Sequence, residues 1–437
     1  MPLFSTLTAA SPTKPDGPAL PRKSIVVAAL STIVEWYDFT LYLFMATILS
    51  RVIFGGGADS LLATLALFAV SYLLRPVGAL IFGRFGDRVG RRPVLLISMA
   101  LMAVAMIATT LLPTHAQAGA FAGAAFLVLR CVMAFSVGGE YAAVSTYLYE
   151  GAHPRRRGLI ASLASMASEI GALLAIAATA LTASLLSPAD LDAWGWRIPF
   201  AFGAALAIAT LAARSTLGET PDFTATAGTT HQPLRTVLTR HRPGLYRTFA
   251  ISALASVTYY VGVIYVPTYL ASSTGIPESQ ALWLSLAASI TVIGVTPFAG
   301  ALSDRIGRQR TLLMLCLAAI LLPVGMFTLM SGPVTTALVA AIVLACTAGC
   351  ITAVAASAAA EQFHPSSRLT GLALGATAAT ALFGGVTPYF AQFLIETTGW
   401  SPAPGALVAV VALAVLPVLA RMPETAPRFQ PSTPNHL

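Results

Sequence analysis

Residues 83–92 read Gly-Arg-Phe-Gly-Asp-Arg-Val-Gly-Arg-Arg, and residues 300–310 read Gly-Ala-Leu-Ser-Asp-Arg-Ile-Gly-Arg-Gln-Arg. Both copies lie between long apolar segments, and Asp87 and Asp304 are 304 − 87 = 217 positions apart in a chain of 437 residues. Other residues recur in the same order at a similar offset: Glu150, His153, Pro154 and Arg157 as Glu361, His364, Pro365 and Arg368, and Glu219-Thr220 as Glu424-Thr425. This repetition predicts a membrane fold of two related halves.

The composition points to lipid as the main solvent. The chain is 57% hydrophobic and 10% charged, which is too apolar for a soluble protein of this size. A segment of about 20 apolar residues crosses the hydrocarbon core of a bilayer. We therefore predict an all-α integral membrane protein with twelve transmembrane helices in two pseudo-symmetric six-helix halves. The expected spans are 24–50, 60–82, 93–113, 118–149, 157–184, 197–214, 246–271, 278–302, 311–330, 334–360, 369–396 and 403–421.

The distribution of positive charge gives the expected orientation. The net charge is +8, and 21 of the 25 Lys and Arg fall on cytoplasmic segments if both termini are cytoplasmic. This bias is typical of membrane insertion and argues against a nucleic-acid partner. The predicted parts are a disordered cytoplasmic tail without signal-peptide features (1–23), a six-helix bundle (24–214), a cytoplasmic central linker (215–245), a second bundle (246–421) and a cytoplasmic tail (422–437).

Ionisable residues at membrane depth are costly and usually functional. A helical rise of about 1.5 Å per residue brings four of them, from three helices, close to the bilayer midplane. These are Glu35, Asp38, Arg130 and Glu169, and we expect them to line a shared polar cavity. Arg75 lies between this level and the cytoplasmic edge, near which Glu140 is placed.

Glu35 and Asp38 are three residues apart and share a helix face, so two ionised carboxylates there would repel each other unless a cation intervenes. Arg130 is the expected cation. A carboxylate whose protonation depends on whether Arg130 is paired with it or with a substrate would couple solute to protons. The alternative is a static ion pair between two helices.

The remaining candidates concern the solute. Arg75 could bind a substrate carboxylate, reach toward the cytoplasm or pair with Glu140. Glu169 could contact the substrate, meet Arg130 or stay neutral. In the second half the polar groups at depth are uncharged, and Tyr259, Tyr260 and Gln392 are the expected substrate contacts. Pro267, Pro297, Gly384, Gly385 and Pro388 are expected to loosen their helices.

The repeated loops are interpreted as a latch. Glycine lets two helices approach, aspartate can hold a helix N-terminus or an arginine, and the arginines pair across one face. Such a network can switch between two arrangements. The predicted gating residues are Gly83, Asp87, Arg88, Gly90, Arg91, Arg92, Glu150, Gly300, Asp304, Arg305, Gly307, Arg308, Arg310, Glu361 and Arg368.

The loops, the twelve spans and the two halves resemble the major facilitator superfamily. Further stretches resemble its metabolite:proton symporters: Glu35-Trp36-Tyr37-Asp38-Phe39, Leu74-Arg75-Pro76, Phe135-Ser136-Val137-Gly138-Gly139-Glu140, Trp194-Gly195-Trp196-Arg197-Ile198-Pro199-Phe200 and Glu219-Thr220-Pro221. The resemblance implies a bacterial inner-membrane symporter that works by alternating access, with proton coupling at acids of the first span and an arginine of the fourth. Asp38, Glu35 and Arg130 match those positions.

We therefore expect proton-coupled symport of a small organic metabolite, in the first place a carboxylate such as α-ketoglutarate or a di- or tricarboxylate, by a monomer. The alternatives are a proton symporter of a zwitterionic osmolyte or amino acid, such as betaine or proline, and a proton-coupled exporter. The short tail after Met422 lacks a heptad pattern, unlike some osmosensing members. Glu169 replaces the neutral residue expected in many relatives.

An enzyme is not expected. The six histidines lie in loops, at span ends or in tails, and no serine or cysteine has a recognisable base beside it. The four cysteines fall within spans and are expected to pack; they are Cys131, Cys316, Cys346 and Cys350. We expect neither a metal nor a cofactor.

Overall fold

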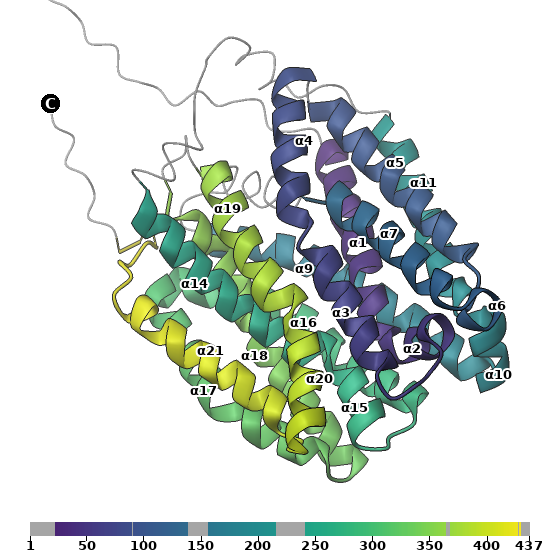
Figure 1. The fold of residues 1–437 in the computed structure, drawn as a ribbon. Coiled ribbons are helices and arrows are strands. Elements are labelled where there is room, and N and C mark those ends of the chain that lie inside the picture. Colours follow the sequence, from purple (N-terminus) through teal and green to yellow (C-terminus); the bar gives the residue numbers. More distant parts are fainter. Residues whose placement is uncertain are drawn as a thin grey trace, which may run out of the picture.

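The chain folds into a bundle of long helices (Figure 1). The structure, a computed structural model, describes residues 22–89, 91–138, 156–215, 241–363, 368–426 and 428–429. Of residues 22–28, 83–89, 91, 92, 95 and 369 it describes the backbone alone. No strand occurs among the described residues. The expected tail 1–23 and linker 215–245 fall almost entirely outside this part of the chain.

The first half of the chain forms one group of helices. They are α1 (Arg22–Phe44), α2 (Ala46–Phe54), α3 (Ser60–Tyr72), α4 (Arg75–Val89), α5 (Arg91–Thr110), α6 (His115–Ala118), α7 (Ala120–Ser136), α9 (Arg157–Leu185), α10 (Pro188–Asp190), the π-helical turn η2 (Leu191–Gly195) and α11 (Arg197–Ser215). Helices α1 and α2 form one broken span with a bend of 68°. The bend falls at Met45, which separates the part that carries Glu35 and Asp38 from the part that carries Arg51.

The second half repeats this plan. Its helices are α14 (Arg242–Tyr259), η3 (Tyr260–Ile264), α15 (Val266–Ser273), α16 (Glu278–Ile306), α17 (Arg308–Met330), α18 (Val334–Ala360), α19 (Arg368–Thr380), η5 (Ala381–Gly385), α20 (Thr387–Thr398) and α21 (Ala403–Ala420). The π-helical turns η3 and η5 each precede an α-helix with proline in its first turn, Pro267 or Pro388. Proline lacks the N–H of the α-helical ladder, which explains the local change of helix type. Pro297, by contrast, lies inside an unbroken α16.

The helices agree with the expected spans. Nine described helices are long and apolar enough to cross a bilayer, and the bent α1–α2 pair makes a tenth. Two shorter apolar helices, Leu96–Thr110 and Ala120–Ser136, occupy two further expected spans. The predicted fold class is therefore confirmed for the described part of the chain.

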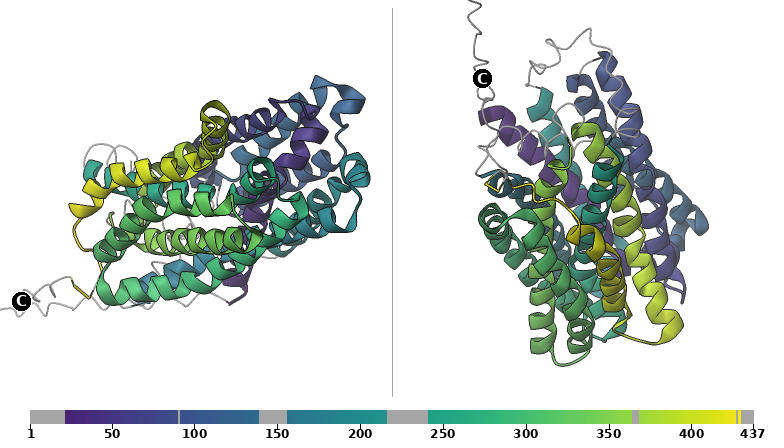
Figure 2. Two further views of the ribbon diagram at one scale, coloured as in Figure 1. Left: turned by 90° about the horizontal axis from the view of Figure 1, so that it is seen from below. Right: turned by 90° about the vertical axis from the view of Figure 1, so that its left-hand side faces the viewer.

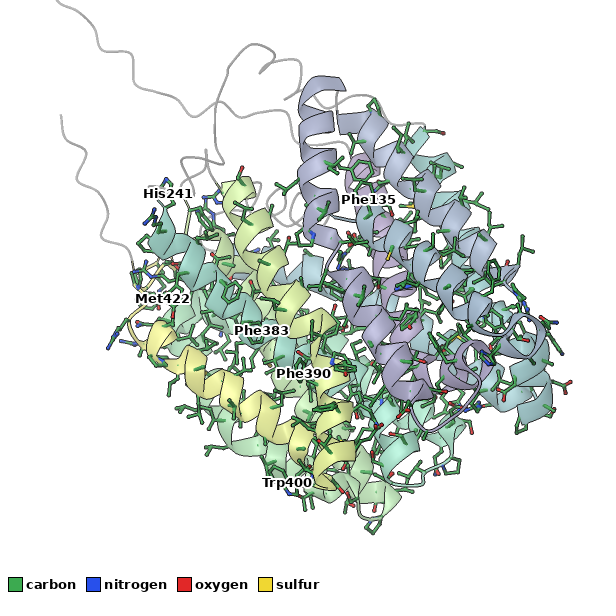
Figure 3. The ribbon with its side chains drawn as sticks, in the orientation of Figure 1. Phe135, His241, Phe383, Phe390, Trp400 and Met422 are labelled. Atoms are coloured by element: carbon green, nitrogen blue, oxygen red, sulfur yellow. The ribbon has the colours of Figure 1, made fainter. Side chains whose placement is uncertain are left out.

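Large apolar side chains cover the outside of the bundle, as Figure 3 shows. Leu321 on α17 is 75% exposed and Phe298 on α16 is 77% exposed, and many other large apolar side chains are also exposed. Apolar surface on this scale would cause aggregation in water, whereas a bilayer solvates it. The outer face of the bundle therefore fits a lipid environment.

Two ends of the bundle are distinguished below. We call the end where α5, α9, α14, α17 and α19 begin the signature end, because residues 83–92 and 300–310 lie there. The opposite end, where α2 ends and α16 begins, is the far end. Helix α9 packs against α1 of its own half and against α16 and α18 of the other. Figure 2 shows the two halves side by side along the length of the bundle.

Candidate functional site

A cavity of about 160 Å³ lies between the two halves. Among the described residues that line it, Arg75 is the one with a charged side chain. The wall also contains the aromatic residues Trp36, Tyr72, Tyr259 and Tyr260 and the hydroxyl residues Ser252, Ser256, Thr352, Thr377 and Thr380. Ala359 and Leu372, near helix ends, also line it, so the cavity extends from the middle of the bundle toward the signature end.

Arg75 at this wall has three kinds of partner. Its guanidinium forms an ion pair with Glu35 of α1, and its Nη1 donates to the hydroxyl of Tyr72 over 2.9 Å. Its charge lies 4.9 Å from the ring centre of Phe39 and 5.0 Å from that of Tyr72. The second carboxylate oxygen of Glu35, Oε2, is buried and has no hydrogen-bond donor among the described residues. Glu35 is thus held by one arginine on one oxygen.

Asp38 and Arg130 form a separate pair between α1 and α7. Arg130 Nη1 lies 3.3 Å from each carboxylate oxygen of Asp38, and both side chains are almost fully buried. The guanidinium also lies 4.8 Å from the ring centre of Tyr42. Neither residue is among those that line the cavity. The pair therefore connects two helices of one half, at a distance from the solute space.

Glu169 of α9 is bonded across the interface between the halves. The hydroxyl of Tyr259, from α14, donates to its Oε2 over 3.0 Å. Glu169 is 4% exposed and does not line the cavity, whereas Tyr259 does. Tyr259 therefore separates a buried carboxyl group from the solute space.

Tyr260, the next residue, makes a second connection between the halves. Its hydroxyl lies 3.1 Å from that of Tyr72, which accepts from Arg75. Two consecutive tyrosines of the second half thus reach toward two buried acids of the first, Tyr259 directly and Tyr260 through Tyr72 and Arg75. Gln392 lies elsewhere: it accepts from Tyr265 over 2.5 Å and donates to Glu396 over 2.8 Å, and it does not line the cavity.

The four residues expected at one depth are therefore buried, but they do not line one shared cavity. Glu35 pairs with Arg75, Asp38 with Arg130, and Glu169 bonds to Tyr259. Depth along a helix fixes one coordinate of a side chain, whereas the direction in which it points decides its neighbours. Arg75 takes the place beside Glu35 that we had expected Arg130 to take. The suggested partner Glu140 lies outside the described residues.

At the signature end the two halves touch through α9 and α16. Asp304 accepts from the backbone N–H of Gly158 over 2.9 Å and of Leu159 over 3.0 Å, so it caps the N-terminus of α9. A Cβ on Gly300 would lie 2.7 Å from the carbonyl oxygen of Gly158 and 2.6 Å from Ser162 Oγ. This approach requires glycine at the crossing.

Arg308 joins several of the predicted gating residues at this end. It is fully buried and donates to Asp304 over 2.8 Å and to Glu361 over 3.2 Å. Arg368 is also buried and donates to the carbonyl oxygens of Ala360 and Phe363. Arg305 and Arg310 are exposed. Two of the remaining predicted gating residues, Gly90 and Glu150, lie outside the described residues. Of the others the structure describes the backbone alone: Gly83, Asp87, Arg88, Arg91 and Arg92.

Glu424 is a contact that the sequence analysis did not assign to the site. It accepts from the backbone N–H of Arg308 over 2.8 Å and of Gln309 over 3.1 Å, and so caps α17. Gly307 precedes this helix with φ of +102°, and a Cβ there would collide with Glu424 at 2.2 Å. Thr425 donates to Glu361 over 2.5 Å. The signal was present, because Glu424-Thr425 repeats Glu219-Thr220.

The far end is held by another ion-pair cluster. Arg51 of α2 lies 3.1 Å from Asp192 and 3.1 Å from Glu278, the first residue of α16. Thr47 also donates to Glu278. Because Glu278 belongs to the second half, these contacts close the far end between the halves. The sequence has no pattern that would identify a partner 227 positions away.

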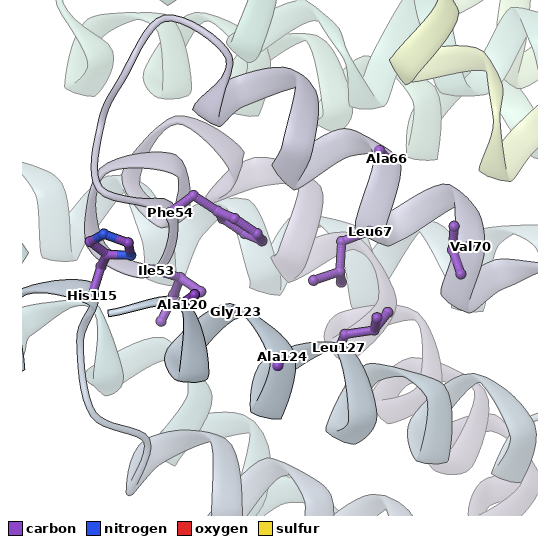
Figure 4. Close-up of a pocket in the computed structure, with 10 residues that line it drawn as sticks. All are labelled: Ile53, Phe54, Ala66, Leu67, Val70, His115, Ala120, Gly123, Ala124 and Leu127. Carbon is purple, nitrogen blue, oxygen red and sulfur yellow. The ribbon is translucent and has the colours of Figure 1, made fainter. Parts of the chain in front are cut away.

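A second hollow, of about 460 Å³, lies away from this interface (Figure 4). Its lining is almost entirely apolar and comes from the first half, with Phe54, Leu67 and Leu127 around it and His115 at one edge. Val70, which also lines it, is 53% exposed. No Asp, Glu, Lys or Arg is among the described residues that line this hollow, so it offers no charge to orient a polar solute and is not the candidate site.

Comparison with known proteins gives the family. The model of the Major Facilitator Superfamily matches residues 28–346 and 250–436. An ectoine/proline transporter of Corynebacterium glutamicum is 34% identical over 413 residues, covering 89% of this chain and 82% of that protein. An α-ketoglutarate permease of Escherichia coli is 33% identical over 383 residues, covering 85% and 87%. The chain therefore belongs to the major facilitator superfamily.

A solved structure agrees on the fold. The xylose transporter of E. coli, in a partially occluded inward-open conformation, matches with a TM-score of 0.73 at 20% identity, over 92% of this chain and 98% of that one. The family, matched over most of the chain, makes the protein a multi-pass membrane transporter and not an enzyme. The expected class, a transporter of small organic molecules, is confirmed.

Proposed function

We propose that the protein carries a small organic carboxylate into the cell together with protons, and that Arg75 binds the carboxylate of the solute. The observation that carries this proposal is the position of Arg75, the one charged side chain among the described residues of the cavity wall. A guanidinium presents two parallel N–H groups to a carboxylate, which fits a solute bound through that group.

Proton coupling follows from the partner of Arg75. A solute carboxylate at Arg75 competes with Glu35 for the same guanidinium. A buried carboxylate that loses its cation binds a proton instead, because burial penalises the charged form. Glu35 is suited to this exchange, since its Oε2 has no donor among the described residues. Asp38 lies three residues after Glu35 on α1 and is paired with Arg130 of α7. We assign this buried pair to the same proton-coupling mechanism.

The orientation and setting are part of the proposal. The excess of Lys and Arg at the signature end supports a cytoplasmic position of that end and of both termini, in the inner membrane of a bacterium. The cavity extends toward the cytoplasm and the far end is closed by Arg51 and Glu278. In the described state the halves touch at both ends, through Glu278 at the far end and through Asp304 at the signature end, and the protein works as a monomer by alternating access.

A second candidate solute is supported by one observation, the aromatic wall. Trp36, Tyr72, Tyr259 and Tyr260 surround the space beside Arg75. Aromatic faces attract an ammonium group, so a zwitterion could place its carboxylate at Arg75 and its cation against these rings. The ectoine/proline transporter is a relative of this kind. In this reading the substrate is proline, betaine or a similar osmolyte.

The test is uptake into proteoliposomes under an imposed inward proton gradient. Labelled α-ketoglutarate and proline are offered separately, each with and without a protonophore. Protonophore-sensitive accumulation of α-ketoglutarate supports the carboxylate proposal, and accumulation of proline alone favours the zwitterion. Accumulation of neither by the wild-type protein contradicts the proposal.

Two variants test the residues. In Glu35→Gln, exchange of labelled for unlabelled solute at equal pH should persist, while the accumulation ratio at a fixed proton gradient should fall. Asp38→Asn is expected to lower the proton-driven accumulation ratio in the same way. If Asp38→Asn still accumulates solute to the wild-type level, Asp38 is not part of the coupling site.

A further inference from the structure

Glu169 is a buried acid that the coupling mechanism above does not use. It lies on α9, is 4% exposed, and accepts one hydrogen bond, from Tyr259, among the described residues. No Lys, Arg or His of the described chain lies within ion-pair distance of it. Glu35 and Asp38, by contrast, each have an arginine.

The charged groups on the elements packed around α9 are engaged elsewhere. On α1, Glu35 and Asp38 are paired with arginines. On α11, Arg214 donates to Ser31, and Arg197 donates to backbone carbonyl oxygens at the far end. On α16, Glu278 binds Arg51 and Asp304 binds Arg308, while Arg305 is exposed. Asp192 of η2 binds Arg51, and α18 carries no charged residue. Tyr259 of α14 is the titratable group that faces Glu169.

A carboxylate without a cation is far more costly to bury than a neutral carboxylic acid. A single hydroxyl donor does not compensate the charge. When Tyr259 of α14 donates to Glu169 of α9, the carboxyl group is buried. This contact is therefore favourable if Glu169 is protonated and strongly unfavourable if it is ionised. Since Tyr259 belongs to the other half, the contact forms and breaks when the halves move.

We infer that Glu169 is a second proton-binding site of the transport cycle, which allows the interface at Tyr259 to close when it is protonated. The inference rests on the proposed symport function and adds a proton to it. When the halves separate at Tyr259, Glu169 meets water and exchanges its proton with it. When they close again, the carboxyl group must carry a proton. Glu35 responds to the solute, whereas Glu169 responds to the closing of the two halves.

The test is the limiting accumulation ratio of the solute at a fixed pH gradient and zero membrane potential, in wild type and Glu169→Gln. Each coupled proton multiplies this ratio by about ten per pH unit. Glu169→Gln mimics the protonated acid, so we expect its ratio to fall about tenfold per pH unit while exchange at equal pH persists. The double variant Glu35→Gln/Glu169→Gln should lose all dependence on the proton gradient. Asp59→Asn, an exposed carboxylate on the far loop, is the matched control and should behave as wild type.

The outcomes separate this inference from the proposed function. If the wild-type protein accumulates no solute, the proposed function fails. If wild type accumulates solute and Glu169→Gln reaches the same ratio, the inference is overturned and the proposed function stands. If Glu169→Gln instead raises the KM of exchange tenfold or more, Glu169 binds the solute, which also overturns the inference.

A spectroscopic readout does not depend on transport. Infrared spectra of the purified protein at neutral pH should contain the C=O stretching band of a protonated buried carboxyl group, and Glu169→Gln should lack it. Tyr259→Phe removes the donor and keeps the ring, so the band should move to higher frequency. If the spectra of wild type and Glu169→Gln do not differ in this band, Glu169 is not protonated and the inference is overturned. The measurement is also conclusive for a variant that folds but transports poorly.

Discussion

Arg75 contacts an acid, two aromatic rings and the solute space at once. For binding a carboxylate, the planar geometry of its guanidinium is as important as its charge. A guanidinium donates two parallel hydrogen bonds to a carboxylate, and an ammonium group does not. In the proposed mechanism, Glu35 and a solute carboxylate exchange at this residue.

For Arg75→Lys we predict about a tenfold rise in the KM of solute exchange, equivalent to about 1.4 kcal/mol of lost binding. The charge stays, but the bidentate geometry is lost. Initial rates of exchange in proteoliposomes over a range of solute concentrations measure this effect, and Arg310→Lys, at an exposed position, is the control. A KM equal to that of wild type would place the carboxylate away from Arg75.

The buried pair of Asp38 and Arg130 gives a prediction about stability. Asp38→Asn leaves Arg130 as a buried charge without its counter-ion, which costs about 3–5 kcal/mol. We expect a clear drop in the Tm of the detergent-purified protein, and a substantial recovery in Asp38→Asn/Arg130→Gln, where both charges are gone. A double variant as unstable as the single one would show that the pair contributes through shape and not through charge.

At the scale of elements, α9 and α16 cross in close contact at the signature end. The carbonyl oxygen of Gly158 and the Cα of Gly300 meet with no space for a side chain. Asp304 then caps α9 from α16, so one short region combines close packing and an N-terminal cap.

Helix α16 offers a matched pair of substitutions for this crossing. We predict that Gly300→Ala slows solute exchange about tenfold, because overpacking costs about 1–3 kcal/mol in the state where these helices touch. Gly294→Ala, on the same helix with nothing within 4 Å of its Cβ, should change the rate less than twofold. Equal rates in the two variants would mean that the crossing is not tight during transport.

At the scale of the whole molecule, Arg51, Thr47 and Glu278 hold the far end shut. Arg51 is 40% exposed and Glu278 21%, so each ion pair contributes about 0–1 kcal/mol. We propose that they bias the equilibrium between the two transport states more than they stabilise the fold.

We predict that Glu278→Gln increases opening of the far end about two- to fivefold, which corresponds to the loss of about 0.5–1 kcal/mol. A single cysteine at Thr268, whose hydroxyl lies 3.5 Å from the carbonyl of Leu43 in the other half, reports this opening in a cysteine-free background. The rate of labelling by an impermeant maleimide should rise in Glu278→Gln and stay constant in Asp190→Asn. Unchanged labelling would show that other contacts keep the far end closed.

The spans could be predicted from the sequence because hydropathy and helix length act within one segment. The predicted 334–360 coincides with α18, and 157–184 with all but one residue of α9. The bend at Met45 has no signal of this kind, since neither glycine nor proline stands there.

The buried acids were found for the same reason, but their partners were not. Spacing places Glu35 and Asp38 on one face of α1, while the choice between Arg75 and Arg130 depends on how three helices pack. Tyr259 and Tyr260 were expected at the substrate and do line the cavity, although the bond from Tyr259 to Glu169 crosses between halves. Trp36 and Tyr72 were overlooked because an aromatic residue in an apolar span carries no distinguishing pattern.

The bend between α1 and α2 has a mechanical consequence. One bent span carries Glu35 and Asp38 in its first part and Arg51 beyond a turn of 68°. A residue beyond such a turn lies away from the axis of the first part, so a rotation of α1 about that axis moves Arg51 along an arc. A rotation of α1 that accompanies a rearrangement of Glu35 beside Arg75 therefore also displaces Arg51 at the far end.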